Sequence, residues 1–79
     1  MHIAIHSIQS TLFEGDAEKL ICETPMGRTT VLDHHLPIIS QIDGPAVFVI
    51  GGDGTQTRVP LAGGFMEVRP GSDVVILAR

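Results

Sequence analysis

The stretch Phe65–Ala78, FMEVRPGSDVVILA, carries the features that decide the fold class of this chain. Two short segments rich in apolar and β-branched residues flank the dipeptide Pro70-Gly71, which is a common turn sequence. Branched and aromatic side chains are favoured in strands because they pack well on a pleated surface. We therefore predict a β-hairpin here, with Pro70-Gly71 at its turn.

The segment Ala46–Leu61 predicts a second hairpin. The apolar run Ala46–Ile50 and the run Thr55–Leu61 flank Gly51–Gly54, whose glycines supply the positive φ that a tight turn demands. Further Gly and Pro breaks divide the rest of the chain, at Pro25–Gly27, Asp43–Pro45 and Gly63-Gly64. No window of 11 or more residues keeps a helical period. Short runs between evenly spaced turn signals are typical of all-β proteins.

The periodicity of the runs indicates how they pack. In the N-terminal run, Ile3 and Ile5 fall on one face of a strand, opposite His2, Ala4 and His6. We predict one all-β domain over residues 1–79, a small antiparallel sandwich or barrel.

The runs Ala46–Ile50 and Asp73–Ala78 are apolar on both faces, as in strands that are covered on both sides. Part of the outer surface should then be hydrophobic, which indicates a docking surface.

Composition excludes several classes of function. The net charge of −4 and only five Lys and Arg argue against a nucleic-acid surface, and three Phe with no Tyr or Trp leave no stacking platform. The single cysteine, Cys22, is predicted to be a buried thiol, as in a reducing cytoplasm. No signal peptide and no apolar run of roughly 20 residues is present, so we expect a soluble protein, or one attached to a membrane only through a partner.

The histidines are the best candidates for a metal or acid–base site. His2 and His6 would lie about 13 Å apart on a strand, too far for one metal ion. In Asp33-His34-His35 the two imidazoles would point to opposite faces of a strand, and Pro37 favours a turn before it. No His-x-His pair or Gly-x-Ser-x-Gly elbow occurs. We predict no catalytic residue, no metal and no cofactor; a small cupin-like metal enzyme using His34 or His35 is the alternative, which elemental analysis would test.

Four motifs follow one another along the chain. They are Leu12–Ala17 (LFEGDA), His34–Ile39 (HHLPII), Asp53-Gly54 and Gly63–Val68 (GGFMEV). In this order and spacing they resemble the N-terminal domain of the epsilon subunit of bacterial F-type ATP synthases. The resemblance spans nearly the whole chain, and Gly15, Gly63, Gly64 and Phe65 match the structural motif.

The resemblance implies a two-sheet antiparallel β-sandwich of about ten short strands. It also implies a non-catalytic rotor subunit of the central stalk, which docks on the gamma subunit and the ring of c subunits and couples ion translocation to ATP synthesis. Such a subunit is peripheral, at the cytoplasmic face of the bacterial inner membrane, and meets the membrane only through the complex.

By position, the resemblance implies two binding segments. The c-ring-facing turn would contain Pro25, Gly27 and Arg28, and the gamma interface would contain His35, Pro37 and Ile38. Arg28 stands where the family commonly has an acid. His34 takes a glycine position, so we expect the local turn to differ.

The sequence stops at Arg79, directly after the expected sandwich. Family members usually continue with a C-terminal helical hairpin that can inhibit ATP hydrolysis. We therefore expect a coupling and assembly subunit without the inhibitory arm. The alternative is a free-standing β-sandwich module, diverged from epsilon, that binds another protein.

Overall fold

The structure, a computed structural model, describes residues 1–79 and contains strands but no helix. The eight strands are β1 (His2–His6), β2 (Thr11–Asp16), β3 (Lys19–Thr24), β4 (Gly27–Leu32), β5 (Ile38–Ile50), β6 (Gln56–Pro60), β7 (Gly63–Arg69) and β8 (Asp73–Ala78). The two predicted hairpins are confirmed as β5–β6 and β7–β8. No helix long and apolar enough to cross a membrane is present.

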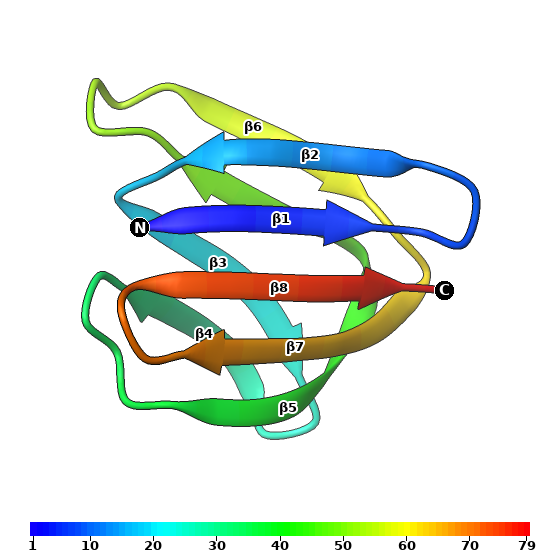
Figure 1. Ribbon diagram of the computed structural model, residues 1–79. Coiled ribbons are helices and arrows are strands. Elements are labelled where there is room, and N and C mark those ends of the chain that lie inside the picture. The colour runs from blue at the N-terminus through cyan, green and yellow to red at the C-terminus, as the bar shows by residue number, and fades with distance from the viewer.

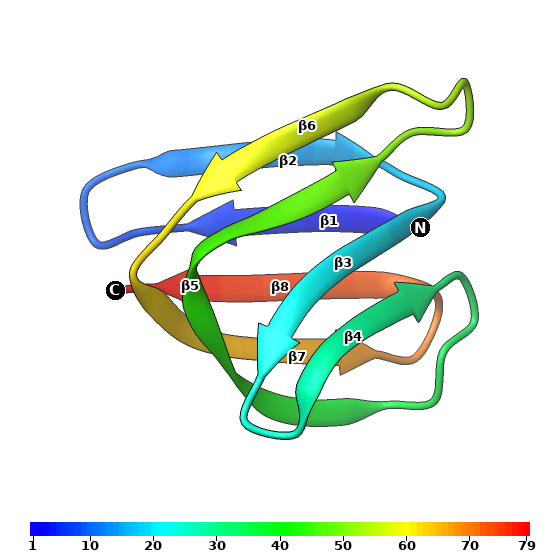
Figure 2. The same cartoon turned by 180° about the vertical axis from the view of Figure 1, so that it is seen from behind.

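The strands form two layers that share β5 (Figures 1 and 2). Hydrogen bonding follows the order β2-β1-β8-β7-β5-β3-β4, and β6 also pairs with β5. The first part of β5, residues 38–43, pairs with β7, whereas residues 46–50 pair with β6 and β3. The chain therefore passes from one sheet to the other at Gly44-Pro45. A Cβ on Gly44 would lie 2.5 Å from the carbonyl oxygen of Leu61, so glycine is required at this bend.

The all-β sandwich is confirmed, with two corrections to its details. There are eight strands rather than about ten, because β5 runs through both sheets as one strand of 13 residues. The sandwich is also not wholly antiparallel, since β1 and β8 pair in parallel. Parallel strands need a long crossover, and here the rest of the chain, β2 to β7, is that connection.

The core lies between the two layers. Sixteen buried residues form one hydrophobic cluster, to which every strand except β2 contributes. The predicted alternation in β1 holds in part: Ile3 and Ile5 are fully buried and His2 is exposed, but Ala4, which was predicted on the face of His2, is also buried. Cys22 is buried in the same cluster, as predicted.

Candidate docking surface

Three large apolar side chains are exposed on the outer face of one sheet. Ile39, Phe65 and Leu77 are 78%, 57% and 59% exposed, and they lie on the neighbouring strands β5, β7 and β8. Phe65 stands directly opposite Leu77 in the pairing of β7 with β8. We call these three residues the apolar face.

The alternation of the strands produces this arrangement. Met66 and Ile76 are fully buried on the inner side of β7 and β8, so their neighbours Phe65 and Leu77 must point outward. Strands that are apolar on both faces therefore cover the core with one side and expose apolar surface with the other. The predicted hydrophobic outer surface is confirmed.

The apolar face is hollowed. One hollow of about 250 Å³ is lined by Ile39, Phe65, Met66, Glu67, Arg69, Val75 and Leu77. A second, of about 370 Å³, is lined by Pro37, Ile38, Ile39, Glu67, Val68 and Pro70. The two hollows share Ile39 and Glu67, so the apolar face continues to the start of β5.

Three charged residues at the border of the apolar face pair with one another. Arg69 donates to Glu67 through Nε at 3.1 Å, and its Nη1 lies 3.7 Å from Oδ2 of Asp73. An apolar centre with a polar, self-paired rim is the usual composition of a protein–protein contact. The arrangement suits binding of an apolar surface and contains no arrangement for chemistry.

The predicted gamma segment lies in the loop between β4 and β5 and at the start of β5. His35 is half-buried, and its Nδ1 lies 2.8 Å from the carbonyl oxygen of Leu36. Pro37 is exposed, whereas Ile38 packs partly against the core. Pro37 and Ile38 both line the second hollow, so this segment is continuous with the apolar face.

The predicted c-ring turn, residues 25–28, lies at the opposite end of β4. The Thr24 hydroxyl donates to the carbonyl of Gly27 at 2.9 Å and accepts from the backbone N–H of Met26 at 3.1 Å. These bonds fix a turn in which Pro25 is exposed and Met26 is 95% exposed. The turn therefore presents an apolar tip, Met26, which is not among the turn residues that the family resemblance implies.

Two residues of this turn have clear conformational or charge roles. Gly27 has a φ of 112°, in the region that favours glycine. The Arg28 guanidinium donates from Nε to Glu23 at 3.1 Å, so its charge is already paired across β3 and β4.

The glycines of the structural motif differ in how strictly the fold requires them. A Cβ on Gly64 would lie 2.1 Å from the carbonyl oxygen of Leu77, and one on Gly63 would meet the Arg79 guanidinium at 2.7 Å. A Cβ on Gly15 would meet only the Phe13 ring, at an ordinary 3.6 Å. Close packing of β7 on β8 thus explains Gly64, and no comparable constraint acts on Gly15.

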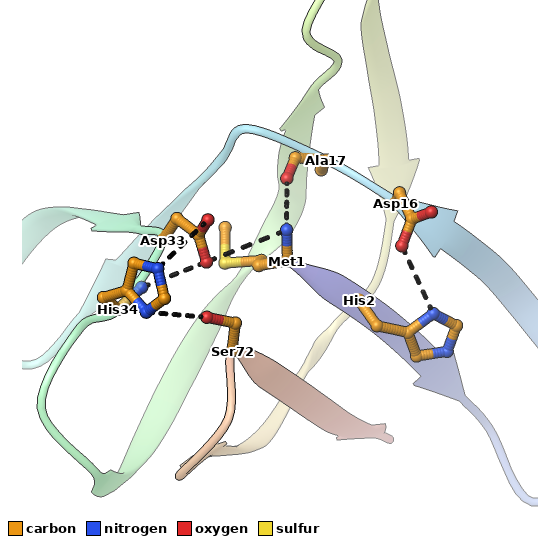
Figure 3. Close-up of polar contacts among 7 residues, drawn as sticks. All are labelled: Met1, His2, Asp16, Ala17, Asp33, His34 and Ser72. Carbon is orange, nitrogen blue, oxygen red and sulfur yellow. Dashed lines mark hydrogen bonds and ion pairs between the residues drawn. The ribbon is translucent and has the colours of Figure 1, made fainter.

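The predicted turn at Asp33-His34-His35 is present. The N–H of His35 donates to the carbonyl of Leu32 at 3.1 Å, and His34 has a φ of 62°. Figure 3 shows the His34 ring beside Ser72. The distance between His34 Nδ1 and Ser72 Oγ is 3.2 Å. Positive φ costs a residue with a side chain about 1–2 kcal/mol, so His34 holds a conformation that glycine would adopt freely.

Polar contacts surround Asp33 as well. Hydrogen bonding to the Ser72 side chain, the nearby His34 imidazole and the N-terminal ammonium all lower the pKa of the Asp33 carboxyl below its usual value. The ammonium of Met1 lies 3.9 Å from Oδ1 of Asp33 and donates to the carbonyl of Ala17 at 2.9 Å (Figure 3). This cluster joins four separate segments at one end of the sandwich: the N-terminus, the β2–β3 connection, the β4–β5 loop and the β7–β8 turn.

The histidines of β1 occupy its two ends. His2 lies between two acids of β2, with Nε2 3.4 Å from Glu14 Oε2 and Nδ1 3.8 Å from Asp16 Oδ1. His6 contacts the Thr11 hydroxyl at 3.1 Å instead. Nowhere does the structure gather three or more His, Cys, Asp or Glu side chains in a way that could hold a metal ion.

The sequence predicts an apolar outer surface but does not show which residues form its centre. Neither Ile39 nor Leu77 was predicted to lie on this surface, although the alternation of Asp73–Ala78 was a usable signal for Leu77. The contact of His34 with Ser72 had no signal, because 38 residues separate them in the sequence.

Comparison with known proteins places this geometry in a family. The family model described as "ATP synthase, Delta/Epsilon chain, beta-sandwich domain" matches residues 1–79. The chain belongs to this family. Among curated relatives, the ATP synthase epsilon chain of Exiguobacterium sp. strain AT1b is 35% identical over 79 residues, which are 100% of this chain and 57% of the relative. That of Laribacter hongkongensis is 31% identical over 77 residues, covering 96% of this chain and 55% of the relative.

Solved structures agree with the family in fold. A chain of the Euglena gracilis mitochondrial ATP synthase, from an assembly of OSCP, F1 and c-ring, matches with a TM-score of 0.86 at 19% identity, over 96% of this chain and 48% of that one. A chain from the central stalk and c-ring of the Tetrahymena thermophila mitochondrial ATP synthase matches with a TM-score of 0.79 at 7% identity, over 98% and 61%. The chain thus spans about half the length of the curated relatives that it matches.

Proposed function

We propose that this chain is a non-catalytic subunit of the central stalk of an F-type ATP synthase, and that it helps couple ion translocation to ATP synthesis. The family match over residues 1–79 is the observation that carries the proposal. The relatives named as ATP synthase epsilon chains support it, as does the exposed apolar face.

The proposed contact with the gamma subunit uses the apolar face together with His35, Pro37 and Ile38. The two connected hollows support this assignment, because they make one surface from Phe65 and Leu77 to Pro37. Burying Ile39, Phe65 and Leu77 would remove the largest exposed apolar side chains of this sheet from water.

The proposed contact with the c ring uses the turn of Pro25, Gly27 and Arg28. This turn and the gamma segment lie at opposite ends of β4, about 20 Å apart along its six residues. Two partners could therefore bind at the same time. A subunit that transmits torque between them must be stiff, and the hydroxyl-bonded turn at Thr24 fits that need.

In this role the chain is peripheral, at the cytoplasmic face of the bacterial inner membrane, and meets the membrane only through the complex. Its partners would be the gamma subunit and the c ring, with no nucleic acid and no cofactor of its own.

Gamma binding is tested with Ile39→Ser and Phe65→Ser. Both side chains are exposed, so each change should alter the melting temperature little but weaken binding to the gamma subunit of the same organism at least tenfold. Arg58→Ala, at an exposed position on β6 in the other sheet, is the matched control and should bind normally. Wild-type affinity in both serine variants would overturn the assignment of this face. Failure of the wild-type chain to bind gamma would favour the free-standing module.

Contact with the c ring is tested by crosslinking. Met26→Cys places a thiol on the exposed tip of the turn, while the native Cys22 is buried and should not compete. A crosslinker should join this variant to a c subunit in the assembled synthase, and Thr57→Cys on β6 should give no such product. A crosslink to a c subunit from Thr57→Cys but not from Met26→Cys would show that the turn does not face the c ring.

A further inference from the structure

Two segments that are distant in the sequence meet beside the proposed gamma segment. The β4–β5 loop contributes His34, and the turn between β7 and β8 contributes Ser72. His34 Nδ1 lies 3.2 Å from Ser72 Oγ, and Figure 3 draws this contact between the two segments. This is the one side-chain hydrogen bond between the two segments.

Both residues hold a conformation that disfavours side chains. His34 and Ser72 are the only non-glycine residues with positive φ, at 62° and 61°. Glycine would adopt either conformation without strain, and the glycine Gly71 already has a φ of 84° in the same turn. The two strained residues of the chain therefore contact each other through the very side chains that cause their strain.

Asp33 completes the cluster. Its Oδ1 accepts from the backbone N–H of His34 at 3.1 Å, and its Oδ2 lies 3.8 Å from His34 Nε2. Among its polar neighbours, Ser72 contributes most to lowering the pKa of the Asp33 carboxyl below its usual value.

We propose that Asp33, His34 and Ser72 form a latch that fixes the β4–β5 loop on the β7–β8 turn and thereby positions Pro37 and Ile38 for binding. The hollow of about 370 Å³ has Pro37 and Ile38 on one wall and Pro70 on another, and the latch joins the two segments that carry these walls. The latch residues are positioning residues. That the positioned segment binds gamma rests on the function proposed above.

The latch acts by preorganisation. A loop that must be ordered at the moment of binding lowers affinity, because the partner must supply the lost conformational entropy. A loop already held on its neighbouring turn avoids that cost. The side chains of His34 and Ser72 thus hold the loop on the turn by a hydrogen bond, which glycines at these positions could not form.

Amide hydrogen exchange in the full-length chain tests the latch without any partner. The reporter is the N–H of His35, which donates to Leu32, and the N–H of Gly54 in the distant β5–β6 turn is the internal control. His34→Ala and Ser72→Ala should each speed exchange of the reporter about two- to tenfold, the range expected for one hydrogen bond. The double variant should exchange no faster than the faster single variant, since both remove the same contact.

Two further variants separate the latch from backbone geometry. His34→Gly relieves the strain but loses the contact, so the reporter should still exchange faster than in the wild type. His34→Asn tolerates positive φ and can still hydrogen-bond Ser72, so it should restore part of the protection. The latch would be overturned if the reporter in His34→Gly kept its wild-type protection. It would also be overturned if the increases in exchange rate of the two alanine variants multiplied in the double variant.

Binding to gamma then tests the positioning role. Ser72→Ala should weaken affinity about two- to tenfold at a temperature at which the variant is still fully folded. Normal gamma affinity together with faster exchange would overturn positioning but leave the contact in place. A wild-type chain that fails to bind gamma would overturn the proposed function and positioning with it, while the exchange experiment still decides whether the latch exists.

Discussion

Gly64 on β7 has no room for a side chain beside β8. It has a φ of 157°, and a Cβ there would lie 2.1 Å from the carbonyl oxygen of Leu77 and 3.0 Å from the backbone of Ala78. Both obstacles are backbone atoms, which cannot move without distorting the sheet. We expect Gly64→Ala to lower the free energy of unfolding by about 2–4 kcal/mol in urea titrations.

The matched control is Gly52→Ala. A Cβ at Gly52 has no atom within 4 Å, and this glycine does not have a positive φ in the left-handed region. Its effect should stay within about 0.5 kcal/mol. Equal effects at the two positions would show that the close approach at Gly64 does not limit stability.

Cys22 gives the chain a predictable response to alkaline pH. Burial, followed by the negative charge of Glu23, raises the pKa of the Cys22 thiol from 9.0 to about 11. Between these values the unfolded chain releases the thiol proton while the folded chain keeps it. The unfolded state then binds fewer protons, so the free energy of unfolding falls as pH rises from about 9 to about 11.

Comparison with Cys22→Ala isolates this effect. The variant should be less stable at pH 8 because it leaves a small cavity, but it should lose less stability than the wild type between pH 8 and pH 10. Urea unfolding at the two pH values measures both quantities. An identical loss in the two proteins would mean that the thiol does not contribute.

At the level of elements, the β1–β2 connection is organised by one hydroxyl. Ser7 Oγ accepts from the backbone N–H of Gln9 at 3.3 Å and of Ser10 at 3.1 Å, and the N–H of Ser7 donates to the carbonyl of Ser10 at 2.8 Å. Ser7→Ala should cost about 1 kcal/mol and lower the melting temperature by about 4–8 °C. Ser10→Ala is the control, since its hydroxyl contacts only Ser7 Oγ, at 3.4 Å. A larger loss for Ser10→Ala would contradict this role for Ser7.

The elements also show what sequence patterns predict well. The hairpins β5–β6 and β7–β8 follow from Gly51–Gly54 and Pro70-Gly71, because turn chemistry is local and acts through few residues. The length of β5 was not predicted. Gly44-Pro45 looked like a break between strands, but the ladder to β7 on one side and to β6 on the other carries the strand through it.

Long-range contacts limited the prediction of the candidate site in the same way. The apolar outer surface follows from the composition of single strands, whereas its centre depends on β5, β7 and β8 being neighbours. The turn at His34 was predicted from its neighbours, but its contact with Ser72 depends on where the β7–β8 turn lies. Local chemistry is readable in the sequence, and the partner that each local feature meets is set by topology.

At the level of the whole molecule, β5 makes the two sheets one cooperative unit. Residues 38–43 belong to the sheet of β7 and residues 46–50 to the sheet of β6 and β3. Val47 in the second half and Met66 on β7 are both fully buried in the same core cluster. If either sheet unfolds, the buried residues of the other sheet become exposed to water. The domain should therefore unfold in one step.

We therefore expect Val47→Ala to destabilise both sheets alike. The change should lower the free energy of unfolding by about 2 kcal/mol, because it removes buried methyl groups from a packed core. Native-state hydrogen exchange should show the same loss of protection for the slowest amides of β3 and of β8, which are in different sheets. Thr57→Ala, on the exposed strand β6, should change neither group by more than about 0.5 kcal/mol. Faster exchange in β3, β4 and β6 alone would show that the sheet containing Val47 opens independently. The two sheets would then not unfold as one cooperative unit, although they share β5.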